Sequence, residues 1–192
     1  MANMSANIFS SMPFIPYKIV MALMENENFC KLIYYNTMDA LSQPNLTIEQ
    51  KQALIWDGDK DRMDHYNIFL TNIQPNSEIE NRTIFKCYRT HTKPLNLVMA
   101  TVAYRFDIIF GSKIPLVFCE GIPCNRGDVI EHEIMKSLNN IDVAGVGKLQ
   151  YNAELTALCG TNIGVGNNYT FAGFSIVMAT QISDLRETVC ND

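Results

Sequence analysis

Residues 102–110 read VAYRFDIIF, and this stretch decides the fold class. Large apolar side chains occupy every second position, namely Val102, Tyr104, Phe106, Ile108 and Phe110. Ala103, Arg105 and Asp107 lie between them. Successive side chains of a strand point to opposite faces, so this period of two predicts a long strand in a sheet that is covered on one face.

Three further segments are predicted to be strands of the same sheet. Residues 83–90 are rich in β-forming side chains, and the turn-prone HTKPLN stretch after them favours antiparallel pairing with residues 102–110. Two later segments also alternate apolar with polar residues. Their apolar members are Leu149, Tyr151, Ala153 and Leu155, then Phe174, Ile176, Met178 and Ile182.

Two other regions have the residue spacing of helices. Between residues 17 and 35, apolar side chains follow helical intervals with a break near 26–28, which predicts one helix or two short ones. Between the second and third strands, Asn125 or Asp128 can cap another helix. Its buried face is expected to carry Ile130, Ile134 and Leu138, and its water-facing side Glu131, Glu133 and Lys136.

The order of these segments, β-β-α-β-β, predicts an α+β fold. We expect a two-layer domain, in which an antiparallel sheet of about four strands packs against one or two helices, with an N-terminal arm and long loops. Thr47 and Gln50 have the spacing of a capping box, which predicts a short helix over residues 48–55.

The chain is long enough for one sizeable core, because 47% of its 192 residues are apolar. We expect a single domain over residues 17–182 and a tail over 183–192. Residues 1–16 are too interrupted by proline for a helix and too apolar for a solvated tail. They are therefore interpreted as an arm that docks on a neighbouring protein.

Charge argues against a protein that grips nucleic acid. The net charge is −5, and no run of Lys and Arg interleaved with aromatic residues is present to bind phosphates. The start of the sequence lacks the features of a secretory signal, and its longest apolar stretch is too short to cross a bilayer. The cysteines form no CxxC pair and are expected to be free thiols in a reducing cytoplasm: Cys30, Cys87, Cys119, Cys124, Cys159 and Cys190.

One acidic loop resembles a calcium site. Asp57, Asp59 and Asp61 alternate like the first ligands of a calcium loop, but Arg62 replaces the glycine and Ile68 the bidentate glutamate. We expect a solvated loop, with no bound metal and no cofactor. The alternative is a small soluble enzyme or metal-binding protein that uses residues 57–65, together with residues 119–132 for an enzyme.

Other catalytic patterns are incomplete. His65, His91 and His132 are far apart in sequence and lack an accompanying Cys or Ser motif, and His132 has no second histidine at helical spacing. The glycines at 145 and 147 lack the rest of a phosphate loop, and those at 160, 164 and 166 lead into a strand rather than a helix. No catalytic residue is assigned, and the protein is predicted not to be an enzyme.

Five segments, in order, resemble a family of tailed-bacteriophage neck proteins. They are FCKLIYYN at residues 29–36, LSQP at 41–44, VAYRFDIIF at 102–110, SLNN at 137–140 and GVGKL at 145–149. The resemblance covers residues 17–182. Two departures are Gly111 and Ser112 after the central strand, where the family has His and its neighbour, and a long GTNIGVGNN insertion before the last strand.

The resemblance implies a structural virion protein of the tail-terminator, tail-completion or head-to-tail connector type. Such a subunit would assemble in the host cytoplasm into a hexameric or dodecameric ring between the portal or adaptor layers and the tail. DNA would pass through the lumen without specific binding, and weak negative potential around the channel would let it slide. The partners would be identical subunits and neighbouring neck or tail rings, with no membrane.

Three regions are expected to form the contacts between subunits, because the predicted sheet and helices do not account for them. They are residues 8–16, 114–124 and 160–168. The apolar side chains assigned to these contacts are Phe9, Phe14, Ile114, Phe118, Ile122, Ile163 and Val165.

Overall fold

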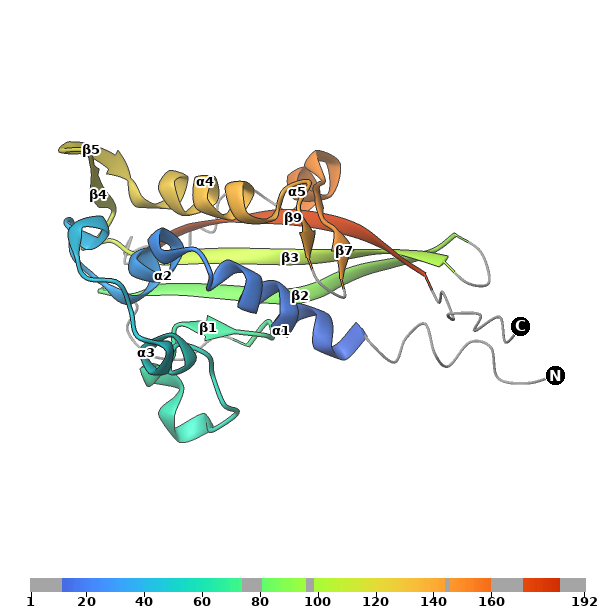
Figure 1. Cartoon of the computed structure of the whole chain (residues 1–192), viewed down its shortest axis with the longest axis horizontal. Helices are drawn as coiled ribbons and strands as arrows, with labels where there is room; N and C mark the ends of the chain where they lie inside the picture. Colours follow the sequence, from blue (N-terminus) through green and yellow to red (C-terminus); the bar gives the residue numbers. More distant parts are fainter. Residues whose placement is uncertain (1–11, 74–80, 96–98, 144–145, 160–170, 184–192) are drawn as a thin grey trace, which may run out of the picture.

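Helices and strands are mixed along the chain in the structure, a computed structural model that describes residues 12–73, 81–95, 99–143, 146–159 and 171–183. Figure 1 shows long strands that run along the length of the domain, with helices beside them. The predicted α+β class is confirmed.

The main sheet has five strands in the order β1-β2-β3-β9-β8. Its long strands are β2 (Thr83–Pro94), β3 (Met99–Gly111) and β9 (Phe171–Ser183), and its short edge strands are β1 (Ile68–Phe69) and β8 (Gln150–Tyr151). Strands β2, β3, β9 and β8 are antiparallel, as predicted. The parallel pairing of β1 with β2 was not predicted. Strand β2 also continues through HTKP, where the turn was expected to begin.

One face of this sheet carries the main core. The alternating apolar residues of β3 are buried there, which confirms the pattern at residues 102–110. Helices α1 (Ile15–Leu23), α2 (Glu27–Tyr34) and α4 (Arg126–Leu138) supply the opposite side of the core. The Phe85 ring links the layers, since it packs edge-on against Phe29 of α2 at 5.2 Å and stacks with Phe106 at 5.8 Å.

The helical segment at residues 17–35 is two helices, because the first ends at Leu23 and Asn26 caps the second. Its Oδ1 accepts a hydrogen bond from the Phe29 N–H at 3.1 Å. The first helix begins earlier than predicted. Met12–Phe14 forms a 3₁₀ helix, η1, and Pro16 lies in the first turn of α1, where proline fits because its missing N–H has no helical partner. The interpretation of residues 12–16 as a non-helical arm is therefore wrong.

Helix α4 is capped by Asn125, whose Oδ1 accepts a hydrogen bond from the Gly127 N–H at 2.8 Å. Its predicted apolar face is confirmed, since Ile130, Ile134 and Leu138 are fully buried. Glu133 was expected to face water but is buried. Hydrogen bonds from the side-chain amides of Asn26 (2.8 Å) and Asn28 (3.2 Å) replace water around its carboxylate.

The predicted strand at residues 149–155 is mostly wrong. Only Gln150–Tyr151 pairs with β9, and Asn152 then caps helix α5 (Ala153–Cys159) by accepting from the Leu155 N–H at 2.9 Å. Helix α5 follows the edge of β9, where the Val177 N–H donates to Thr156 Oγ1 at 2.9 Å. The cap at Asn152 and the contact of Thr156 with β9 therefore favour a helix where the alternation of apolar residues predicted a strand.

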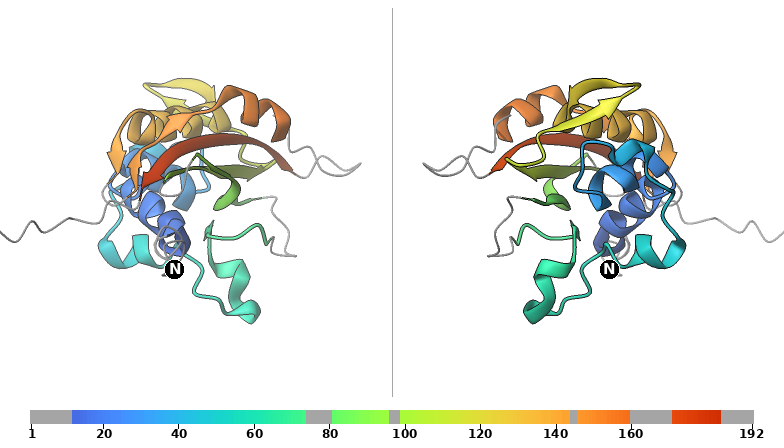
Figure 2. Two further views of the ribbon diagram at one scale, coloured as in Figure 1. Left: turned by 90° about the vertical axis from the view of Figure 1, so that its right-hand side faces the viewer. Right: turned by 90° about the vertical axis from the view of Figure 1, so that its left-hand side faces the viewer.

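Smaller elements complete the domain. The capping box at Thr47 and Gln50 is confirmed, and helix α3 spans Ile48–Gln52. Two 3₁₀ helices, η2 (Ala40–Ser42) and η3 (Lys60–His65), lie in connecting segments, and β6 (Asp142–Val143) pairs with β7 (Gly147–Lys148). The view along the long axis in Figure 2 shows a curved sheet with α1 and α2 on one side.

Candidate assembly surface

A β-hairpin projects from one end of the domain, at the left of Figure 1. It consists of β4 (Leu116–Cys119) and β5 (Ile122–Asn125), joined by Glu120 and Gly121. Both turn residues have positive φ, 53° and 83°, as the tight turns of two-residue hairpins require. This hairpin lies within the region predicted for subunit contacts.

The hairpin presents apolar side chains to solvent. Phe118 is 38% exposed and Ile122 is 65% exposed, whereas Val117 is fully buried against the domain. The Phe118 N–H donates to the Met38 carbonyl at 2.7 Å and so ties the hairpin to the segment after α2. Its exposed apolar side chains are therefore held on a defined backbone.

Arg126 fixes the base of the hairpin from inside the protein. Its guanidinium is fully buried and donates to four backbone carbonyls: Ile114 (3.0 Å), Leu32 (2.9 Å), Tyr35 (3.1 Å) and Thr37 (2.6 Å). Burial lowers the pKa of Arg126 to about 10, so the side chain is still protonated at neutral pH. Sequence reasoning missed this residue, because one arginine between a strand and a helix carries no local signal of burial.

A groove of about 920 Å³ lies between the hairpin and α4, with α2 and η2 beside it. Its apolar lining includes Leu41, Phe118, Ile122 and Val129, and its carboxylates are Glu120, Asp128 and Glu133. None of the described residues that line it is a Lys or Arg. The groove therefore combines apolar area with negative potential.

The thiols of Cys119 and Cys124 also line this groove, and the strand register places them on the same face of the hairpin. Partial burial and a hydrogen bond with Cys124 raise the pKa of Cys119. A thiol with a raised pKa is protonated at neutral pH and is a poor nucleophile. His132 lines the groove as well, but the structure gives it no hydrogen bond to either thiol within the described residues.

The predicted contact residues divide into three groups. Phe14, Phe118 and Ile122 are exposed and available to a partner. Ile114 is 5% exposed, so its assignment to an interface is wrong: the Arg126 bond to its carbonyl holds it inside the domain. Phe9, Ile163 and Val165 lie outside the described residues.

A second exposed apolar patch combines Phe14, which was predicted, with Tyr17 and Met21, which were not. Phe14, Tyr17 and Met21 follow one another at helical spacing along η1 and α1, and each is more than one third exposed. Tyr17 and Met21 line a groove of about 400 Å³ with Ile141, which follows α4. The periodicity of residues 17–35 indicated which side chains are buried, and this patch is the remaining face of α1.

The acidic loop at residues 57–65 binds its own arginine. Arg62 donates to Asp59 at 2.7 Å and to Asp57 at 3.0 Å, and the Tyr66 hydroxyl donates to Asp57 at 2.7 Å. A hydrogen bond from the Asp59 backbone N–H and that from Tyr66 lower the pKa of Asp57. In the described part of the chain, no group of three or more His, Cys, Asp or Glu side chains is arranged to hold a metal ion.

The polar cluster on the second face of the sheet is internally satisfied. Asp107 is buried and accepts from Tyr88 (2.8 Å), Arg105 (2.6 Å) and Ser175 (2.6 Å). Burial and the bond to Asp107 raise the pKa of Tyr88. Because these groups bind one another across β2, β3 and β9, the cluster stabilises the sheet.

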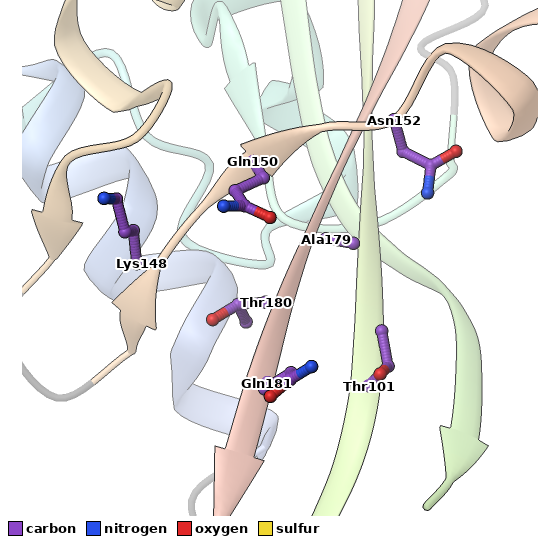
Figure 3. Close-up of a pocket in the computed structure, with 7 residues that line it drawn as sticks. All are labelled: Thr101, Lys148, Gln150, Asn152, Ala179, Thr180 and Gln181. Carbon is purple, nitrogen blue, oxygen red and sulfur yellow. The ribbon is translucent and has the colours of Figure 1, made fainter.

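Figure 3 shows another shallow pocket, of about 410 Å³, at the junction of β3, β8 and β9. Its lining is polar and includes Thr101, Gln150, Asn152 and Gln181, together with the charged side chain of Lys148. Thr180 donates to the Val146 carbonyl at 3.2 Å. Among the residues that the structure describes, this lining contains neither a carboxylate nor a histidine that could serve as a general base.

Comparison with known proteins identifies the family of this chain. A family model described as YomW matches residues 26–180, which include the hairpin, α4 and most of the sheet. The chain belongs to the YomW family. That family is named after a gene in a phage region of a Bacillus genome, so the protein is phage-associated. No curated protein and no solved structure matches the chain.

The YomW match agrees with the coarser part of the resemblance, namely an association with bacteriophages. Among the helices that the structure describes, none has the length and apolar character to cross a bilayer.

Proposed function

We propose that this YomW-family protein is a structural subunit of a phage particle, and that identical copies form a closed ring in the neck or tail. The ring joins the portal or adaptor layers to the tail, and DNA passes through its lumen. The protein carries out no catalysis and requires no cofactor. Hexameric and dodecameric rings are both compatible with the proposal.

The observation that carries the proposal is the exposed hairpin. Phe118 and Ile122 are exposed on a backbone that Arg126 holds through its bonds around the hairpin base. Exposed apolar side chains on a rigid support are a common feature of protein interfaces. A ring needs two different complementary patches on each subunit. The α1 patch of Phe14, Tyr17 and Met21 lies on a different element from the hairpin and supplies a second exposed apolar surface.

The net charge of −5 is consistent with a DNA channel. A subunit that bound phosphates tightly would slow the passage of DNA, whereas a weakly negative wall would not hold it. The groove beside the hairpin has an excess of carboxylates as well. Both features favour contacts with protein over contacts with nucleic acid.

A stop codon in the gene for this chain tests the proposal. We expect the mutant phage to produce DNA-filled heads and separate tails, visible by electron microscopy, and to regain joined particles when the chain is supplied in trans. A synonymous change of the same codon is the control. Joined, infectious particles in the absence of the chain would contradict the proposal.

A further inference from the structure

The groove between the hairpin and α4 is large enough to hold several side chains, at about 920 Å³. Phe118 and Ile122 are its exposed apolar residues, and Leu41 and Val129 are half-buried apolar residues of its lining. Its ligand should therefore present at least one large apolar side chain. The carboxylates of Glu120 and Asp128 add hydrogen-bond acceptors, so the same ligand should offer donors and carry no negative charge.

Residues 1–11 of this chain, MANMSANIFSS, have this composition. They include no Asp or Glu, and Ile8 and Phe9 are flanked by Asn7 and Ser10, whose amide and hydroxyl groups can donate to carboxylates. Residues 184–192, DLRETVCND, carry three acidic residues against one arginine. The negative potential of the groove would repel that segment and would not repel residues 1–11.

Phe9 is too far from the groove of its own copy to bind there. Met12 contacts Arg89 of β2, and from there η1 and α1 run toward α2 and the hairpin end of the domain (Figure 1). A 3₁₀ helix of three residues and an α-helix of nine span roughly 19 Å together. Phe9 lies three residues before Met12 and extends at most about 11 Å beyond it. Its ring therefore falls short of Phe118 and Ile122 in its own subunit.

We infer that residues 1–11 of one copy dock in the groove between the β4–β5 hairpin and α4 of a second copy, with Phe9 against Phe118 and Ile122. The inference deepens the proposed function, on which it rests, because it supplies a head-to-tail contact between ring subunits. The arm leaves the domain at the start of η1, and its receptor lies at the hairpin end. Such a contact is heterologous and can close into a ring.

Photo-cross-linking of the full chain tests the inference. Phe9 is replaced with p-benzoylphenylalanine, and this protein is mixed with an isotope-labelled copy before irradiation. We expect cross-links that join residue 9 of one isotopic form to residues 118–133 of the other. Cross-links within one copy, cross-links to other surfaces, or no cross-link would each overturn the inference.

A peptide titration provides a second test that leaves the protein unchanged. A fluorescent peptide of residues 1–11 should bind the full chain saturably, and a peptide with Asn7→Glu and Ser10→Glu should bind at least about tenfold more weakly because of the groove's carboxylates. A Phe9→Ala peptide should also lose affinity. Equal binding of all three peptides, or no binding of the natural one, would overturn the inference.

The two proposals can fail separately. If rings are present in phage particles but residue 9 cross-links to another surface, the groove contact is refuted and the ring function stands. If residue 9 cross-links to the groove but the chain is missing from particles, the ring function is refuted and the contact stands.

Discussion

Arg126 binds four carbonyls that belong to different segments of the chain. Ile114 precedes the hairpin, Leu32 lies in α2, and Tyr35 and Thr37 follow α2. A buried charge is costly unless its hydrogen bonds are complete, and the planar guanidinium has enough donors for all four acceptors. One side chain thus positions the base of the exposed hairpin.

Replacement of Arg126 by Ala should lower the free energy of unfolding by roughly 3–5 kcal/mol, since it leaves buried carbonyls without donors. Arg126→Lys should recover only part of the loss, because an ammonium group cannot reach all four acceptors. Urea denaturation measures both. Arg62→Ala is the matched control: its partners are solvent-exposed, so we expect a loss below about 1 kcal/mol. An Arg126→Ala protein as stable as the control would contradict this role.

Gly173 of β9 pairs with Ile109 of β3 and lies close to the β3 backbone. A Cβ atom at this position would be 2.4 Å from the carbonyl oxygen of Ile108, which is backbone and cannot rotate away. Gly173→Ala should therefore separate the strands locally and cost about 1–3 kcal/mol. Hydrogen exchange of the β9 amides should become faster. Unchanged exchange and stability would show that the two strands tolerate a wider spacing.

At the scale of elements, two asparagine caps have different surroundings. Asn125 caps α4 at an exposed position, whereas Asn26 caps α2 and also donates to Glu133 at 2.8 Å. A carboxylate can serve as an N-cap and is favoured by the helix dipole. The same substitution should therefore have different consequences at the two positions.

Asn125→Asp should change the free energy of unfolding by less than about 0.5 kcal/mol, whereas Asn26→Asp should lower it by about 1–3 kcal/mol at pH 7. In the second variant the carboxylate introduced at position 26 would face the carboxylate of Glu133, and the repulsion between them opposes folding. The penalty applies only while both groups are ionised, so it should disappear as the pH falls below about 4. Thermal unfolding of both variants at pH 7 and at about pH 3 checks the sign, and a loss that persists at the lower pH would contradict it.

Some elements were predictable because burial on one side imposes a period on the sequence. Residues 102–110 and 174–182 alternate because one face of β3 and β9 lies in the core, and α4 repeats Ile130, Ile134 and Leu138 for the same reason. Residues 149–155 alternate as well, but Asn152 caps a helix there. A short alternating run does not distinguish a strand from a capped helix, and β1 is too short to show any period.

The contact surface was predictable only in part. Phe118 and Ile122 were identified because they belong to no predicted element and are apolar, and both are exposed. Ile114 has the same sequence character, but its side chain is buried and its carbonyl accepts a hydrogen bond from Arg126. That contact joins residues that local sequence patterns do not connect. Burial of Glu133 likewise depends on amides more than 100 positions away.

For the whole molecule, the hairpin should be needed for assembly and not for folding. Phe118→Asp with Ile122→Asp should leave the melting temperature nearly unchanged, because both side chains are exposed, but should abolish incorporation into particles. Ile48→Asp, at a position that is 71% exposed on α3, is the matched control and should assemble normally. Immunoblots of purified particles measure incorporation. Normal incorporation of the double variant would exclude the hairpin from the interface.

The ring itself is tested most directly by quantitative mass spectrometry of gradient-purified phage particles, with labelled peptides of this chain and of the portal protein as standards. The account predicts a small fixed copy number per particle, in the ratio expected of one hexameric or dodecameric ring. Absence of the chain from mature particles, or a copy number comparable to that of the major capsid protein, would contradict it.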